Sequence, residues 1–173
     1  IYSTQGAFAG LNKHNEIITW GNKRFGGDTS NIRHLLNNIT NIYTTNSAFA
    51  ALKKNETVIT WGDLKSGGNS SNVANDLFDI INIYGNKSAF AALKKDNTVI
   101  TWGNHNSGGD TTNIKHLLVD IIEIYYTDFA FAALKKNKTV ITWGDELYGG
   151  NINVSTTIDK IYATHDTFIM MSE

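Results

Sequence analysis

A tandem repeat with a period of 41 residues governs what this chain can fold into. The period is kept by four tryptophans, Trp20, Trp61, Trp102 and Trp143, and by the Ile-Tyr pairs that begin at Ile1, Ile42, Ile83 and Ile124. It divides the chain into repeats 1–41, 42–82, 83–123 and 124–160, with the start of a fifth at 161–173. A unit of this size cannot bury both of its faces alone, so we expect neighbouring repeats to stack on one another.

Each repeat contains three short stretches with the composition of β-strands. In the third repeat they are 80–85, 88–95 and 98–103, which combine β-branched, aromatic and small apolar residues. The polar link 94–97 predicts a hairpin turn, because its Asp and Asn tolerate left-handed dihedral angles. A glycine pair follows each Trp-Gly after about four residues, and we expect these pairs to need a positive φ or a close backbone approach.

After each glycine pair the sequence predicts one short helix. In the first repeat Ile32, Leu35, Leu36 and Ile39 follow the i, i+3, i+4, i+7 spacing of a helix, with a polar cap candidate upstream. The alternative is an irregular outer strand, which would give each repeat four strands. In the fourth repeat this segment, NINVSTTIDK at 151–160, is too short and too rich in β-branched residues for the helix.

The stretch IIEIYYTDFAFAALKKNKTVITWGDELYGGN at 121–151 resembles the repeat of the regulator of chromosome condensation family. In that family an apolar opening strand leads to a strand ending in Ala-Leu, a polar turn and a strand ending in Trp-Gly. The resemblance covers essentially the whole chain. It implies a mainly β repeat protein with propeller-like blades of three to four antiparallel strands, in which Trp and Phe pack between blades. An open repeat spiral is the alternative, because the family's ring takes about seven blades.

Two departures from the family pattern limit what the resemblance implies about activity. The repeat is shorter than the family's, and a Gly-Gly pair stands where the family has a GQLG-like stretch. The best-known member catalyses nucleotide exchange on the small GTPase Ran and docks on nucleosomes, which makes nucleotide exchange one alternative function. No catalytic residue is carried over, because the loops that would have to match are the ones that differ.

Composition narrows the class of partner. The formal net charge is -1, with 15 basic and 16 acidic residues mixed along the chain, so we expect no nucleic-acid partner. No apolar run approaches the roughly 18 residues that span a bilayer, so we expect no membrane insertion. The absence of cysteine excludes disulfides, thiolate metal sites and a cysteine nucleophile.

The sequence does not determine the cellular compartment of the protein. Six glycosylation sequons weakly favour a secreted or cell-surface protein, and they begin at Asn38, Asn55, Asn69, Asn86, Asn137 and Asn153. The sequence opens without Met, and it starts and stops inside the repeat pattern. We therefore expect a processed product or a part of a larger repeat protein.

Candidate catalytic and metal-binding residues do not cluster in the sequence. The five histidines are His14, His34, His105, His116 and His165, and only His34 and His116 share a repeat position. Asx residues near the glycine pairs, such as Asp63, Asn69 and Asp110, are interpreted as turn caps, because one carboxylate per loop is a poor cage for calcium. We expect no enzymatic activity, no cofactor and no metal.

We expect the residues that decide specificity to lie where the repeats differ, since the invariant positions are needed for packing. The repeats differ between Trp-Gly and Gly-Gly, and the candidate binding residues there are Asn22, Lys23, Arg24, Phe25, Asp63, Leu64, Lys65, Asn104, His105, Asn106, Asp145, Glu146, Leu147 and Tyr148. A second candidate is a basic rim at the hairpin tips, formed by Lys53, Lys54, Lys94, Lys95, Lys135 and Lys136. It would suit an acidic protein or glycan, and the alternative is that tip lysines keep the chain soluble and discourage edge pairing.

The sequence thus predicts a non-catalytic repeat scaffold for protein–protein interaction or self-association. Carbohydrate binding is an alternative, in which the four tryptophans would be sugar-stacking platforms in repeated pockets. Packing between repeats is the favoured role of these tryptophans and of Phe8, Phe49, Phe90 and Phe131, because each lies in an apolar strand.

Overall fold

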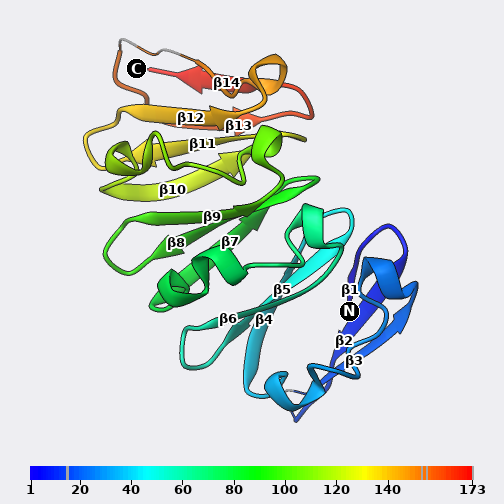
Figure 1. Cartoon of the computed structure of the whole chain (residues 1–173). Coiled ribbons are helices and arrows are strands. Elements are labelled where there is room, and N and C mark those ends of the chain that lie inside the picture. The colour runs from blue at the N-terminus through cyan, green and yellow to red at the C-terminus, as the bar shows by residue number, and fades with distance from the viewer. Residues whose placement is uncertain (15, 153, 155, 173) are drawn as a thin grey trace.

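The computed structural model describes residues 1–14, 16–152, 154 and 156–172, which form a row of antiparallel sheets that follow one another along the chain. Four three-stranded blades come first and a two-stranded blade ends the row. The strands are β1 (Tyr2–Ser3), β2 (Ala7–Leu11), β3 (Ile17–Gly21), β4 (Ile39–Thr44), β5 (Ala48–Lys53), β6 (Val58–Gly62), β7 (Ile80–Gly85), β8 (Ala89–Lys94), β9 (Val99–Gly103), β10 (Ile121–Tyr126), β11 (Ala130–Lys135), β12 (Val140–Gly144), β13 (Lys160–Ala163) and β14 (Phe168–Met171). The first and last blades lie at opposite ends of an open array (Figure 1). The predicted repeat of β blades is confirmed.

The second and third strands of each complete blade form the predicted hairpin. In the second blade Phe49 lies opposite Trp61, and the two rings stack with centroids 5.0 Å apart. The turn closes where the Glu56 N–H donates to the Lys53 C=O at 2.8 Å, and Glu56 takes a left-handed φ of 64°. This is a three-residue loop whose last residue is left-handed. The left-handed residue is Asn97 in the third blade and Lys138 in the fourth, so asparagine fills this position only once among the three.

Consecutive blades pack through small residues on one blade and aromatic residues on the next. Ala48, Ala50 and Leu52 of the second blade share a core cluster with Phe90 and Trp102 of the third. Equivalent clusters join the other consecutive blades. We call the alanine-bearing side of a blade its forward face and the side with Phe and Trp its backward face. Alanine leaves room for the aromatic rings, so the faces pack without large voids.

The glycine pairs complete each junction between blades. The indole N–H of Trp61 donates to the Gly26 C=O at 3.1 Å, and Trp102 and Trp143 make the same contact with Gly67 and Gly108. The first glycine of a pair has a positive φ, 99° at Gly67. A Cβ on the second, Gly68, would lie 2.5 Å from the Gly62 carbonyl oxygen. Both reasons expected for these glycines therefore hold.

The segment after each glycine pair contains the predicted short helix in the first three repeats, where it is a 3₁₀ helix and not an α-helix. These helices are η2 (Arg33–Leu35), η4 (Ser71–Asp76) and η6 (Lys115–Leu117). In the first repeat Leu36 is buried but Leu35 is exposed, and Ile39 already begins β4. The helix is therefore shorter than the spacing of these residues indicated, because a tight turn and the start of a strand bury Leu36 and Ile39. The described residues of the fourth repeat have no helix in this segment, as the sequence indicated.

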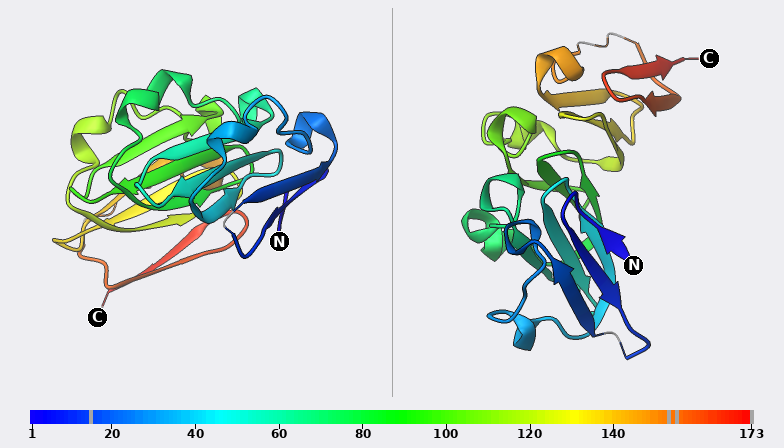
Figure 2. Two further views of the ribbon diagram at one scale, coloured as in Figure 1. Left: turned by 90° about the horizontal axis from the view of Figure 1, so that it is seen from below. Right: turned by 90° about the vertical axis from the view of Figure 1, so that its right-hand side faces the viewer.

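Another set of 3₁₀ turns, not predicted, fills the stretch between Trp-Gly and Gly-Gly. These turns are η1 (Lys23–Phe25), η3 (Leu64–Ser66), η5 (His105–Ser107) and η7 (Glu146–Tyr148), and we call them the post-WG turns together with the residue before each. Viewed from below, the 3₁₀ turns gather along one side of the array (Figure 2, left). The predicted binding residues between Trp-Gly and Gly-Gly therefore lie in short 3₁₀ turns and not in long loops.

The first strands of successive blades are neighbours and form the inner side of the array. Tyr2 Oη donates to Asn41 Oδ1 at 3.1 Å, and Tyr43 Oη donates to Asn82 Oδ1 at 2.8 Å, so tyrosines tie one blade to the next. In the fourth blade Glu123 replaces this asparagine. Burial of Tyr125 and its hydrogen bond to Glu123 raise the pKa of the Tyr125 phenol far above its ordinary value.

Local contacts explain three of the sequons. Asn55 and Asn137 accept from the hydroxyls of Thr57 and Thr139 at 2.8 and 2.7 Å, and in the third repeat Asp96 accepts from Thr98 in the same way. The Asn-x-Thr pattern therefore follows from a turn cap that aspartate also makes. The side-chain amide of Asn86 is buried and donates to the Ser107 C=O at 2.7 Å. The sequon at Asn153 lies outside the described residues.

Candidate functional site

The loops between the first and second strands of the five blades share one turn geometry. We call residues 3–6, 44–47, 85–88, 126–129 and 163–166 the inner loops. Thr45 Oγ1 accepts from the Ala48 N–H at 3.0 Å and donates to the Ser66 C=O at 2.9 Å. Thr4, Asn86 and Thr127 make the same two kinds of contact. Each of these inner loops is thereby fixed to the post-WG turn of its own repeat.

A ladder of backbone hydrogen bonds joins the inner loops of successive blades. The Gln5 N–H donates to the Asn46 C=O at 2.8 Å, and the Asn46 N–H donates to the Lys87 C=O at 3.1 Å. The ladder continues from Lys87 to Asp128 at 3.0 Å and from Asp128 to His165 at 2.9 Å. Because only main-chain atoms form it, the ladder holds these positions in a row whatever side chain each position carries.

The side chains on this row differ in every blade and border one hollow, which we call the inner cavity. The row consists of Gln5, Asn46, Lys87, Asp128 and His165, and all five blades line the cavity. Its volume is about 730 Å³, and Ser3, Thr44 and Tyr126 also line it. A volume of this order accepts a small ligand or several side chains of a partner.

One ion pair between the third and fourth blades dominates the electrostatics of the inner cavity. Lys87 Nζ lies 2.6 Å from Asp128 Oδ2, and His165 Nδ1 lies 3.4 Å from the other carboxylate oxygen. The hydrogen bond to Asp128 raises the pKa of Lys87. Burial acts to raise the pKa of Asp128, but the hydrogen bonds from Lys87 and His165 outweigh burial and lower it. Lys87 and Asp128 are therefore both charged at neutral pH.

An aromatic pair extends this charged cluster toward the post-WG turn of the fourth repeat. Phe129 of the inner loop meets Tyr148 edge-on, with ring centroids 4.8 Å apart. Lys87 Nζ lies 5.3 Å from the Phe129 ring centroid. The inner cavity and the post-WG turns therefore belong to one end of the blades, which we call the loop face.

The predicted binding residues of the post-WG turns fall into three groups. Asn22, Asp63, Asn104 and Asp145 cap the turns with their side chains, which accept from the backbone N–H groups that follow. The next two positions are exposed in every repeat, and they are Lys23, Arg24, Leu64, Lys65, His105, Asn106, Glu146 and Leu147. Phe25 and Tyr148 are half-buried. The capping residues serve the fold. The exposed ones are accessible to a partner, and three of them also form ion pairs within the chain, Lys23 with Asp28, Arg24 with Asp63 and His105 with Asp110.

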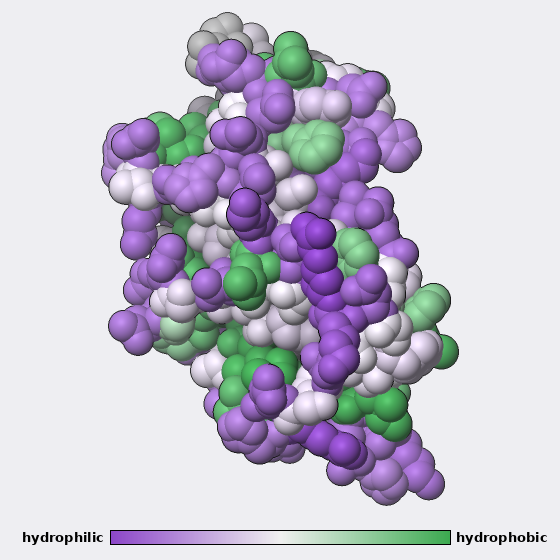
Figure 3. Space-filling model, turned by 45° about the vertical axis from the view of Figure 1, so that its right-hand side comes forward, coloured by the Kyte–Doolittle hydropathy of each residue, from purple (hydrophilic) through white to green (hydrophobic). Residues whose placement is uncertain are grey.

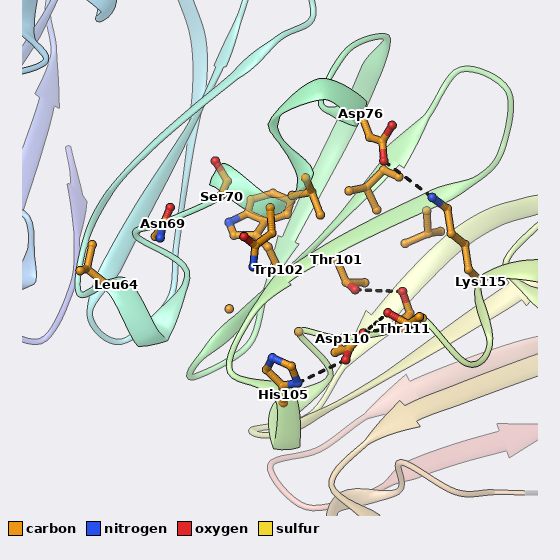
Figure 4. Close-up of a pocket in the computed structure, with 17 residues that line it drawn as sticks. Leu64, Asn69, Ser70, Asp76, Thr101, Trp102, His105, Asp110, Thr111 and Lys115 are labelled. Atoms are coloured by element: carbon orange, nitrogen blue, oxygen red, sulfur yellow. Dashed lines mark hydrogen bonds and ion pairs between the residues drawn. The ribbon is translucent and has the colours of Figure 1, made fainter.

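A second hollow lies on the outer side, between the second and third blades (Figure 4). Its volume is about 490 Å³, and Leu64 and His105 from two successive post-WG turns line it. His105 Nδ1 lies 3.2 Å from Asp110 Oδ2, and Lys115 Nζ lies 3.7 Å from Asp76 Oδ2. The structure thus brings two of the predicted residues together across a repeat boundary.

The lysine pairs lie at the end of the strands opposite the loop face, and the two members of a pair differ. Lys53 Nζ donates to the Leu35 C=O at 2.9 Å, and Lys135 makes the same contact with Leu117. Lys94 is buried, with Nζ 3.8 Å from the Phe78 ring centroid. The second members, Lys54, Lys95 and Lys136, are exposed, and Lys95 pairs with Glu56 of the preceding blade at 2.5 Å. Binding by a basic rim stays a prediction that rests on these three.

The part of the chain that the structure describes was also searched for metal-binding clusters and membrane-spanning helices. There, no three His, Cys, Asp or Glu side chains gather closely enough to hold a metal ion. Over the same residues, no helix combines the length and apolar character needed to cross a membrane.

The inner loops lie outside the binding residues predicted from the sequence. Aligning the repeats on Ile-Tyr and Phe-Ala would have found them, because the residues in between change from Gln5 to Asn46, Lys87, Asp128 and His165. These positions vary because their backbone, and not their side chain, makes the contact between blades.

Comparison with known proteins identifies the fold. No model of a protein family matches the sequence, and no curated protein matches it. Prp20p from Saccharomyces cerevisiae, the yeast RCC1 protein, is similar over 98% of this chain and 54% of its own, with a TM-score of 0.61 and 15% identity. The ectodomain of the receptor kinase CR4 from Physcomitrella patens is similar over 94% of this chain and 44% of its own, with a TM-score of 0.57 and 14% identity.

Human WBSCR16 is a third similar structure, with a TM-score of 0.55 and 13% identity over 99% of this chain and 56% of its own. This chain spans about half the length of these structures. At such identities the likeness shows the fold alone. The fold is an RCC1-like β-propeller repeat, as the resemblance of 121–151 to that family's repeat indicated.

Proposed function

We propose that this protein is a non-catalytic repeat scaffold that binds a protein partner through its loop face. One observation carries the proposal: five different side chains sit at equivalent positions of an otherwise regular backbone ladder and border one cavity. The Phe, Trp and Gly positions of the junctions recur because every junction needs the same packing. The row from Gln5 to His165 is free of that requirement, so its variation can serve recognition.

A protein fits the loop face better than a small molecule does. The inner loops that line the cavity are hydrogen-bonded to the post-WG turns, whose exposed side chains include Lys23, Arg24, Glu146 and Leu147. Charged, amide and apolar groups are thus spread over several blades, which suits the mixed rim and pockets of a protein interface. The charges of Lys87 and Asp128 would orient a polar group of the partner.

The structural neighbours support a protein partner without identifying it. Prp20p is described with its binding to Gsp1p and histones and in complex with Kap60. Exchange on a small GTPase therefore remains a finer hypothesis for this chain, tested by whether it accelerates nucleotide release. Carbohydrate stacking has less support, because Trp61, Trp102 and Trp143 are buried and offer no free ring face.

Affinity capture with matched variants tests the proposal. The bait is the whole chain, compared with Lys87→Ala/Asp128→Ala, which removes both charges of the ion pair and keeps the backbone ladder. Lys54→Ala is the control, since it removes an exposed charge at the opposite end of the strands. We expect a partner that the wild type and the control retain and that the double variant loses by at least about tenfold in affinity.

Amide exchange of the captured complex then locates the contact. Protection of 44–47, 85–88 and 126–129 would support the loop face, whereas protection of the hairpin turns alone would refute it. Equal capture by the wild type and the double variant, together with unprotected inner loops, would also refute the proposal.

A further inference from the structure

The outer edge of the third blade carries backbone groups without a partner. In the hairpin of β8 and β9 the Lys94 N–H donates to the Thr98 C=O at 3.0 Å, so Ile100 and Trp102 also bond toward β8. The N–H and C=O of Thr101, between them, point away from β8. β9 is the last strand of its sheet, and among the described residues neither of these two groups has a hydrogen bond. Thr101 therefore offers one donor and one acceptor at a sheet edge.

This edge lies at the bottom of the hollow between the second and third blades. We call the hollow the outer groove, and it is lined by β9 and by residues of the segments 69–76 and 110–115. Thr101 is only 6% exposed, and buried backbone groups in folded proteins are nearly always paired. The groups of Thr101 therefore require water or a ligand. A folded sheet brings neighbouring strands with it, so a recessed edge is accessible to a single extended segment and not to another sheet.

Polar side chains of two successive repeats line the groove. They are Asn69, Asn72 and Asp76 of the second repeat and Asp110, Thr112 and Lys115 of the third. Asp76 and Lys115 join the two sides through their ion pair, and His105 pairs with Asp110 near the end of β9 (Figure 4). Amide, hydroxyl and charged groups suit a polypeptide better than an apolar ligand. On the face that Figure 3 shows, the described apolar side chains lie in separate groups divided by polar ones, so no broad apolar patch marks a partner there.

The ion pair across the groove is particular to this repeat boundary. One repeat earlier, the positions of Asp76 and Lys115 are Leu35 and Ala74, which cannot form an ion pair. The strand edge recurs in every repeat, whereas the charges beside it do not. The groove between the second and third blades thus combines a general backbone feature with side chains of its own.

The fourth repeat shows a chain segment beside an outer strand. Thr142 corresponds to Thr101, and its Oγ1 accepts from the Ile152 N–H at 2.8 Å. Ile152 and Val154, two β-branched residues at alternate positions, pack against the cluster between the fourth and last blades. In the third repeat the Thr101 hydroxyl instead pairs with that of Thr111 at 3.0 Å. The corresponding place beside β9 therefore receives no backbone N–H from its own repeat.

We propose that the outer groove binds an extended peptide segment of a protein partner, which adds a strand to the edge of β9. A residue of this segment would accept from the Thr101 N–H and donate to its C=O. β9 has five residues, so the paired segment would span about 17 Å. Charged side chains of the segment would meet Asp76 and Lys115 or His105 and Asp110. The outer groove shares no lining residue with the inner cavity, so this is a second site beyond the proposed function.

A phage-displayed library of random short peptides, panned on the immobilised whole chain, supplies the probe. Fluorescence polarisation of a labelled synthetic copy of a selected peptide measures its dissociation constant. Amide exchange followed by NMR locates the contact. We expect the N–H of Thr101 to exchange at least about tenfold more slowly in the complex, because it gains a hydrogen bond.

Two substitutions of Thr101 separate backbone pairing from the side chain. Thr101→Val keeps the N–H and removes the hydroxyl, whereas Thr101→Pro removes both, and proline is tolerated at a sheet edge. We expect Thr101→Pro to bind the peptide at least about tenfold more weakly than Thr101→Val does. Circular dichroism checks that both variants fold. Lys87→Ala/Asp128→Ala should bind the peptide as the wild type does, because both residues line the inner cavity.

N-methylation of the peptide tests the strand geometry with the protein unchanged, so this test holds even if Thr101→Pro does not fold. Alternate residues of an added strand point their N–H toward the sheet. A methyl group at these residues should weaken binding at least about tenfold, and a methyl group at the residues between them by less than about twofold.

Three results would overturn the proposal. The library could yield no peptide that protects the Thr101 N–H. N-methylation could weaken binding equally at adjacent residues, which would indicate that side chains alone are recognised. Binding that is lost in Lys87→Ala/Asp128→Ala and kept in Thr101→Pro would assign the peptide to the inner cavity.

Discussion

The first and third blades contain the same aromatic pair in different surroundings. Phe8 and Trp20 stack with centroids 5.5 Å apart and an interplanar angle of 16°, and Phe90 and Trp102 stack at 5.2 Å and 27°. The third-blade pair is buried and the first-blade pair is nearly half exposed. Strand register within the hairpin therefore sets the stack, whereas a preceding blade is needed to bury it. Local geometry and burial are separable in this repeat.

Truncation of the phenylalanine should give the largest difference in stability loss between the first and third blades. Phe90→Ala removes a ring buried between blades, so we expect it to lower the free energy of unfolding by about 3–5 kcal/mol. Phe8→Ala should cost about 1 kcal/mol, because its ring already contacts water on one side. Urea unfolding followed by circular dichroism measures both. Similar losses would show that the stack itself, and not its burial, stabilises the blade.

Glycine substitution should show the next largest difference. Alanine at Gly67 would keep a φ of 99° and place its Cβ 2.5 Å from the Phe90 ring, so we expect a loss of about 2–4 kcal/mol. Gly10→Ala is the matched variant in the first blade. Its Cβ would lie 3.4 Å from Trp20, an ordinary contact, and the second to fourth blades already have alanine there.

Gly10→Ala should therefore be neutral or stabilise by about 0.4–1 kcal/mol through a less flexible unfolded chain. Thermal unfolding of the two variants, each at low protein concentration, tests the pair. Destabilisation by Gly10→Ala as large as that by Gly67→Ala would mean that the first blade is packed as tightly as the third.

Substitution of the inner-loop threonines should give a smaller difference in stability loss between blades. Thr127 is buried, accepts from the Ala130 N–H at 3.1 Å and donates to the Tyr148 C=O at 2.9 Å. Thr127→Val keeps the shape but leaves both backbone groups unpaired, so we expect a loss of about 1–3 kcal/mol. Thr164→Val in the exposed last loop should change stability by less than about 0.5 kcal/mol. Amide exchange of Ala130 and Thr167 compares the two loops directly.

The frame of the repeat could be predicted from the sequence and the inner loops could not, for one physical reason. Repeated Phe, Trp and Gly residues report side-chain packing, so their spacing predicted the hairpins, the junctions and the role of the glycine pairs. The inner ladder is made by main-chain atoms, which leave no residue signature at Gln5, Lys87 or Asp128. The helix predicted from the spacing of Ile32 to Ile39 is shorter than that spacing indicated, because a turn followed by a strand buries Leu36 and Ile39 as well. Repeat variation was the available signal, and it marked both the post-WG turns and the inner loops.

Removal of the ion pair in the inner cavity should have the smallest effect on the free energy of unfolding, and that effect should depend on pH. Lys87 and Asp128 join the third blade to the fourth, whereas the equivalent residues at the first junction, Gln5 and Asn46, are neutral. Because the folded pKa of Asp128 lies below its unfolded value of about 3.9, the unfolded chain binds more protons in acid. The stabilising contribution is therefore present above about pH 4 and is lost as the pH falls through the folded pKa.

Asp128→Asn should lower the free energy of unfolding by about 0.2–1 kcal/mol at pH 7, since both partners contact water. The difference between wild type and variant should shrink as the pH falls below about 4, where Asp128 becomes protonated in the wild type as well. A double-mutant cycle with Lys87→Met isolates the pairwise energy, and Gln5→Glu in the first blade is a control that adds a carboxylate to the row. A difference that stays constant down to strong acid would assign the effect to the shape of the side chain. In that case the charge would be available for a partner and would contribute nothing to the junction, which would bring the third junction closer in character to the first.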